Sequence, residues 1–164
     1  LTMKNQESIR YTYCHRKMVQ YLAKQYVKEE QQNVYEQVQN HDLDKMFLYL
    51  FYNQKDASAI HRKLTSHHKN EIPKSKTDYI EMVLDWESAR YTKPDKPLNA
   101  YDTLYRYYPE MEEVILPILQ EFGIAQTNLP MEPKALAYAN QLKNVTMDEI
   151  QNEMIQDLKR IFSE

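Results

Sequence analysis

The spacing of apolar residues along the chain predicts helices rather than strands. A first helix is expected over residues 6–28, because apolar or inward positions recur there every three or four residues. These positions are Tyr11, His15, Met18, Leu22 and Tyr26. Residues 29–39 are polar apart from Val34, Tyr35 and Val38, so this segment is expected at the surface. The apolar run 46–52 that follows is expected to be buried.

Prolines and capping residues divide the rest of the chain. Asp56 is expected to cap a helix whose inward stripe is Ile60, Leu64, His67 and His68. Ser75 or Thr77 is expected to cap a helix over 78–91 that is apolar on most sides and therefore belongs at the centre of the fold. Further helices are expected at 109–122, ended by Gly123, and after a capping box formed by Thr146 and Glu149. The pattern predicts a compact all-α bundle of about seven helices.

Composition narrows the class of protein. The chain has 164 residues, about one domain, and a single glycine, which argues against phosphate-binding glycine loops and tight β-hairpins. A net charge of −3 makes nucleic acid an unfavourable partner. One cysteine excludes an internal disulfide, and the longest apolar run is too short to span a membrane. We therefore expect a cytoplasmic protein without a membrane partner.

Histidines and carboxylates are the candidate chemical groups. His15, His67 and His68 occupy inward positions, although one buried histidine is often satisfied by a backbone carbonyl. Asp78, Glu81 and Asp85 form an acidic stripe on the most apolar helix; the alternative is that this stripe simply faces solvent. Imidazole and carboxylate together suit a divalent transition metal.

The motif order links these groups to a known superfamily. His15, then His41-Asp42, then Asp85 resembles the H…HD…D order of the HD-domain metal-dependent phosphohydrolases, which are all-helical. The stretch 41–86 is more closely similar to an uncharacterised family of small bacterial and phage proteins. Its motifs are HD-x-x-K, H-x-x-x-x-x-HH and E-M-x-x-D-W, matched here by His41-Asp42 with Lys45, His61 with His67-His68, and Glu81-Met82 with Asp85-Trp86.

The resemblance implies an HD-like helical domain over residues 1–123. Residues 124–164 would form an appended helical pair that packs on this domain or on a partner subunit, so a homo-oligomer could form through it.

The resemblance also implies a reaction and roles for the motif residues. His15, His41, Asp42 and Asp85 would hold a divalent ion (Zn, Mn, Fe, Co, Ni or Mg) that activates water to hydrolyse a nucleotide or another small phosphate ester. Lys45 could hold a phosphate, or it could be a solvated lysine. His67 and His68 could bind a second metal or act as acid and base, or cap a helix. Glu81 could orient a histidine or activate water.

Two further interpretations remain. The chain could be a non-catalytic helical protein with a degenerate HD-like site, acting by binding metal or a partner. Single-stranded nucleic-acid binding through tyrosines and arginines is disfavoured by the net charge. Around the proline loop, a phosphorylated substrate could contact Arg90, Lys93, Lys96 or Arg106, and a base could stack on Tyr101, Tyr105, Tyr107 or Tyr108. Solvation of the cations and packing of the tyrosines are the alternatives.

Overall fold

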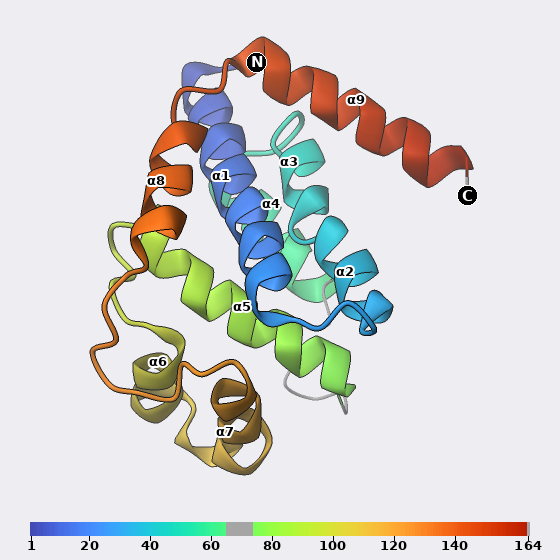
Figure 1. Ribbon diagram of the computed structural model, residues 1–164. Coiled ribbons are helices and arrows are strands. Elements are labelled where there is room, and N and C mark those ends of the chain that lie inside the picture. The colour runs from blue at the N-terminus through green and yellow to red at the C-terminus, as the bar shows by residue number, and fades with distance from the viewer. Residues whose placement is uncertain (65–73, 164) are drawn as a thin grey trace.

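Two helices cross at the centre of the molecule. The computed structural model describes residues 1–64 and 74–163, and this part of the chain contains helices and no strand (Figure 1). Helix α1 (Met3–Tyr26) packs across α5 (Lys76–Thr92). Around them lie α2 (Gln32–Gln39), α3 (Leu43–Leu48), α4 (Gln54–Leu64), α6 (Ala100–Tyr107), α7 (Glu112–Glu121), α8 (Pro133–Leu142) and α9 (Met147–Ser163). The all-α prediction is confirmed.

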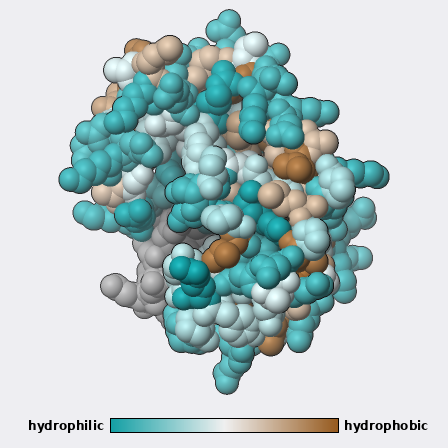
Figure 2. Space-filling model, turned by 90° about the vertical axis from the view of Figure 1, so that its left-hand side faces the viewer, coloured by the Kyte–Doolittle hydropathy of each residue, from teal (hydrophilic) through white to brown (hydrophobic). Residues whose placement is uncertain are grey.

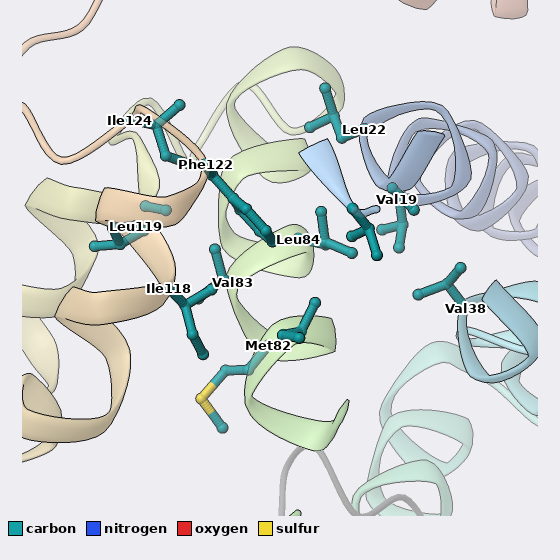
Figure 3. Close-up of a cluster of buried hydrophobic side chains, with 14 of the residues drawn as sticks. Val19, Leu22, Val38, Met82, Val83, Leu84, Ile118, Leu119, Phe122 and Ile124 are labelled. Carbon is teal, nitrogen blue, oxygen red and sulfur yellow. The ribbon is translucent and has the colours of Figure 1, made fainter. Parts of the chain in front are cut away.

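The helix that is apolar on most sides is the central one, as its pattern predicts. α5 contacts α1, α2, α6, α7 and α8. Figure 3 shows its Val83 and Leu84 between Val19 and Leu22 of α1 and Ile118 and Leu119 of α7. Its N-terminus is fixed by a capping box between Ser75 and Asp78, so Ser75 rather than Thr77 is the cap.

A second buried cluster joins the two ends of the chain. Ile9 and Tyr13 of α1 pack with Met46 of α3 and with Ile150 and Met154 of α9. Ala135 and Ala139 of α8 belong instead to the cluster around α5. Both helices after residue 124 therefore pack on the helices that precede it (Figure 1).

Turn chemistry follows the sequence at several helix ends. Gly123 has φ +72° after α7, a left-handed conformation that suits glycine. The helix expected at Pro109 begins as a 3-10 turn, Pro109–Met111, and continues as α7. Thr146 and Glu149 form the expected reciprocal bonds at the start of α9.

Residues 29–64 agree only in part with expectation. The segment 29–39 lies mostly at the surface, as expected, and Val34 and Val38 of α2 are its buried residues. The apolar run is buried only at its start: Met46 and Tyr49 face the core, whereas Phe51 is 81% exposed just past the end of α3.

The helix after this run also begins earlier than expected. The side chain of Asn53 accepts from the backbone N–H of Asp56, so Asn53 takes the capping role expected of Asp56. The buried positions of α4 are Ala57 and His61, and Leu64 of the predicted stripe is exposed.

The described surface is largely polar. The face in Figure 2 is mostly hydrophilic, with hydrophobic residues in small separate patches. Among the described residues, no helix combines the length and the apolar character needed to cross a bilayer.

Candidate metal centre

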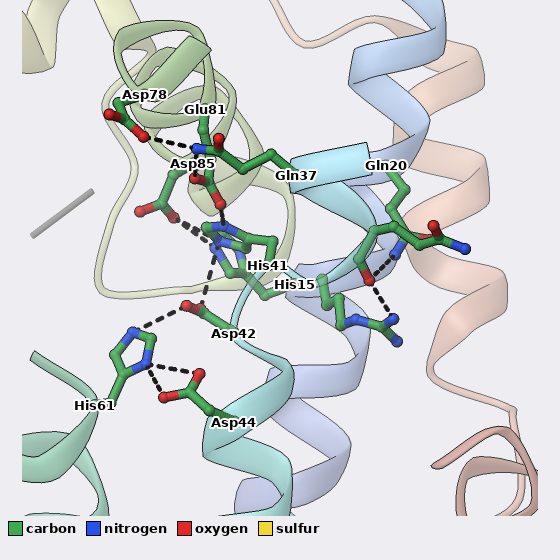
Figure 4. A network of polar contacts seen from close by, with 12 residues as sticks. His15, Gln20, Gln37, His41, Asp42, Asp44, His61, Asp78, Glu81 and Asp85 are labelled. Atoms are coloured by element: carbon green, nitrogen blue, oxygen red, sulfur yellow. Dashed lines mark hydrogen bonds and ion pairs between the residues drawn. The ribbon is translucent and has the colours of Figure 1, made fainter. Parts of the chain in front are cut away.

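Three segments bring the predicted residues to one place. His15 comes from α1, His41 and Asp42 from the turn between α2 and α3, and Glu81 and Asp85 from α5 (Figure 4). His15, His41 and Asp42 are buried, and each offers one ligand atom within 4.8 Å of the other two. Residues separated by up to 70 positions in the sequence thus meet in the interior.

Asp85 bridges the two histidines. Its Oδ1 lies 2.6 Å from His15 Nε2 and 3.6 Å from His41 Nε2. The acidic stripe of α5 therefore does not simply face solvent, because its carboxylates turn toward α1 and α2. The Asp85 side chain is nevertheless 15% exposed, so it contacts both the buried histidines and solvent.

Glu81 fixes the ring of His41. Its Oε2 accepts from His41 Nδ1–H at 2.7 Å, and its Oε1 accepts from the amide of Gln37 at 2.6 Å. Gln37 also donates to Asp78 at 2.9 Å. A histidine that donates one ring N–H to a carboxylate presents the other nitrogen as a metal ligand. The geometry thus favours the predicted role of Glu81 in orienting a histidine.

Asp42 has an unusual backbone. It adopts φ 55° and ψ 13°, in the left-handed region, as the residue before α3. Aspartate tolerates this region better than most residues with a Cβ atom. The sharp turn brings His41 and Asp42 to the same centre: Asp42 Oδ2 lies 3.5 Å from His41 Nε2.

A further histidine, His61, contacts the outer side of Asp42. Its Nε2 lies 3.0 Å from Asp42 Oδ1, and its Nδ1 lies 2.9 Å from Asp44 Oδ2. Sequence reasoning quoted His61 only within the family motif and missed it and Asp44 as site residues. The signal in the sequence was that His61 follows Ala57 by four residues, so both lie on one face of a helix. In the structure these two residues are the buried positions of α4.

The pKa values of His15 and His41 are shifted in opposite directions. Burial, together with the nearby charge of Lys93, lowers the pKa of His15 to about 4. Burial also opposes protonation of His41, but Asp42, Asp85 and Glu81 outweigh it and hold the pKa of His41 well above its usual value. Burial would raise the pKa of Asp85, but its bonds to both histidines hold that pKa well below the usual range. Without a metal, these shifts favour a neutral His15 and a protonated His41.

The distances suit a small divalent cation. Metal–ligand bonds of about 2.0–2.2 Å place neighbouring ligand atoms about 3–3.5 Å apart. The separations of 3.5 and 3.6 Å from His41 Nε2 to Asp42 and Asp85 are close to this spacing. The 2.6 Å contact between His15 and Asp85 is a hydrogen bond that would lengthen by less than about 1 Å. The donor set and its spacing therefore fit a metal ion.

The turn that carries His41 is tied to α9. The buried guanidinium of Arg16 donates to the carbonyl of Gln39 and forms an ion pair with Asp157 at 3.3 Å. Arg160 donates to the side chain of Asn40 at 2.8 Å. Two residues of α9 thus support the turn immediately before His41.

The remaining candidates lie in different places. Lys45 is half-buried one turn after Asp42, and its backbone N–H donates to the Asp42 carbonyl. His67 and His68 lie outside the described residues. Arg90 is engaged by Glu87 at 3.2 Å and by the carbonyl of Leu129, so it supports the fold.

The chain was also compared with known proteins. Neither protein-family profiles, nor curated proteins, nor solved structures gave a significant match. The findings at this point are an all-helical fold and a buried cluster of His15, His41 and Asp42 that could hold a metal ion.

Proposed function

We propose that the protein is a metal-dependent phosphohydrolase of HD-domain type that acts on a small phosphate ester. The observation that carries this proposal is the buried cluster of His15, His41 and Asp42, with Asp85 beside both histidines. Burial of such groups is costly unless they are paired or bind a cation, so a polar cluster at the centre of a small fold favours a ligand-binding role.

In this proposal each side chain of the cluster has a distinct role. The Nε2 atoms of His15 and His41 and the carboxylates of Asp42 and Asp85 would hold the ion. Such an ion, when bound, supplies Lewis acidity that lowers the pKa of water and polarises a phosphoryl oxygen. Glu81 holds the proton on His41 Nδ1 and so keeps Nε2 directed inward. The exposed part of Asp85 marks the side from which a substrate can approach.

The alternative is a polar core without catalysis. The contacts of His61 with Asp42 and Asp44, and of His15 with Asp85, already pair these groups, which favours this alternative. In that case a bound metal, or no metal at all, would stabilise the fold.

Metal content and turnover, measured on the same samples, separate the two. The purified protein is stripped with a chelator, reloaded with each divalent ion in turn, and assayed for phosphate release from phosphate monoesters, diesters and nucleotides. The proposal expects about one or more ions per chain and activity that Asp42→Asn removes. Asp148→Asn, an exposed carboxylate at the start of α9, is the matched control and should change neither. Metal binding without turnover on any phosphate would overturn the catalytic proposal and favour the structural alternative.

A further inference from the structure

A cleft opens next to the metal centre. It has a volume of about 350 Å³, within the range of small-molecule sites, and lies between α5, α6 and the loop 93–99. Asp85, which contacts both central histidines, is one of its lining residues. A ligand in this cleft would therefore lie beside the cluster.

One wall of the cleft is aromatic. The rings of Trp86 and Tyr108 stack with centroids 4.9 Å apart and an angle of 12° between their planes. Tyr107 lies edge-on to Tyr108, and all three residues line the cleft. The Trp86–Tyr108 stack joins α5 to the end of α6, so a planar group in the cleft would meet rings that already pack on each other.

The loop beside this wall supplies positive charge. Lys93 and Lys96 both line the cleft, and a backbone bond of 2.9 Å from Lys96 N–H to the Lys93 carbonyl keeps them in one turn. Neither Lys93 nor Lys96 forms an ion pair with another described residue, unlike Lys17 and Lys76. The effect of Lys93 on the pKa of His15, second to that of burial, is consistent with an ammonium close to the centre.

The loop also carries one acidic side chain, Asp95, which lines the cleft. Burial of Tyr11, followed by the nearby charge of Asp95, raises the pKa of Tyr11 to about 12. This carboxylate therefore lies near Tyr11 of α1, and Lys93 and Lys96 are the positive charges of the loop.

We propose that this cleft is the substrate subsite and that it selects phosphate esters carrying a planar aromatic group. Trp86 and Tyr108 contact the ring, while Lys93 and Lys96 hold the phosphate beside Asp85. This inference rests on the proposed function for its choice of phosphate, but the binding step itself requires no turnover. Among small phosphate esters it favours nucleoside monophosphates over sugar phosphates.

Trp86 makes the cleft directly observable, because it is the only tryptophan in the chain. Fluorescence excited at the red edge of tryptophan absorption is followed while AMP, ribose 5-phosphate, adenosine or inorganic phosphate is added to the full-length protein. The titrations are run on protein as purified and after chelator treatment, with circular dichroism confirming the fold. AMP is expected to quench Trp86 and to bind about tenfold more tightly than ribose 5-phosphate or adenosine.

Three variants test the assignment. Replacing both lysines (Lys93→Ala with Lys96→Ala) should weaken AMP binding about tenfold or more and leave adenosine binding unchanged. Tyr108→Leu should weaken AMP and adenosine binding alike. Lys159→Ala, an exposed lysine on α9, is the matched control and should bind AMP as the unmodified protein does.

The outcomes separate this inference from the proposed function. Equal affinity for AMP and ribose 5-phosphate, or AMP binding that is unaffected by the double lysine replacement, would overturn the subsite even if phosphate esters are hydrolysed. Binding of AMP with the expected variant pattern, but without hydrolysis under any metal, would support the subsite and overturn the proposed reaction.

Discussion

Replacing Glu81 tests whether the carboxylate that orients His41 controls the metal centre. Glu81 is buried and accepts two hydrogen bonds, from His41 Nδ1 at 2.7 Å and from Gln37 Nε2 at 2.6 Å. Glu81→Ala removes both acceptors. Loss of a carboxylate that orients a metal-bound histidine costs roughly 10- to 100-fold in metal affinity. The free energy of unfolding of the metal-free protein should also fall by about 2–5 kcal/mol, because the buried His41 and the half-buried Gln37 both lose this acceptor.

The conservative variant separates geometry from charge. In Glu81→Gln the new amide oxygen can still accept from His41 Nδ1–H, so the ring keeps its orientation. The new amide nitrogen, however, would face the amide nitrogen of Gln37, so two donors would meet. The Gln37 amide cannot rotate to offer its oxygen without losing its 2.9 Å hydrogen bond to Asp78. We expect Glu81→Gln to weaken metal binding by less than about tenfold, between the unmodified protein and Glu81→Ala.

Isothermal titration of the metal-free variants with a divalent ion gives the dissociation constants, and urea unfolding gives the free energies. Glu113→Ala, an exposed glutamate on α7, is the control for loss of a negative charge. If folded Glu81→Ala binds the ion within about twofold of the unmodified protein, the argument that Glu81 fixes a metal-binding histidine is refuted.

Three other outcomes follow from the structure. The pKa of His41 lies well above its usual value and that of His15 is about 4, so metal binding at neutral pH should release about one proton. Titration heats in buffers of different ionisation enthalpy measure this number. Metal affinity should also rise with pH until the folded pKa of His41 is passed. Release of two protons, or none, would contradict this assignment. Met46→Ala should cost about 2–5 kcal/mol in urea unfolding and Phe51→Ala less than about 0.5 kcal/mol, because only Met46 is buried; similar costs would contradict the burial pattern. Asp157→Ala should destabilise the protein by about 3 kcal/mol in urea unfolding, since it removes the ion-pair partner of the buried Arg16 guanidinium. A change below about 0.5 kcal/mol, roughly the effect of a surface substitution, would show that this ion pair does not stabilise the fold.

The central fold and most of the central cluster could be predicted from the sequence. The period of apolar residues predicted α1, and the apolar character of residues 78–91 on most sides predicted the central α5. The turn residues Ser75 and Gly123 marked helix ends that depend on local chemistry. His15 could be expected inside because it occupies an apolar position of α1, an inference that needs no long-range contact.

What the sequence did not predict depends on contacts between distant segments. Nothing local distinguishes Met46 from Phe51, because their burial depends on where α3 ends and on how α9 covers it. His61 required knowledge that α4 faces Asp42. Similarly, the inward turn of Val34 and Val38 depends on the contacts of α2 with α1 and α5.

The bonds between α9 and the turn before His41 connect the end of the chain to the ligands. Arg16 holds the carbonyl of Gln39 and Asp157 together, and Arg160 holds Asn40. If the cluster holds a metal, as we propose, a fusion partner or truncation that displaces α9 should weaken metal binding while leaving all the proposed ligand residues intact. The C-terminal boundary chosen for a recombinant protein would then affect its metal content.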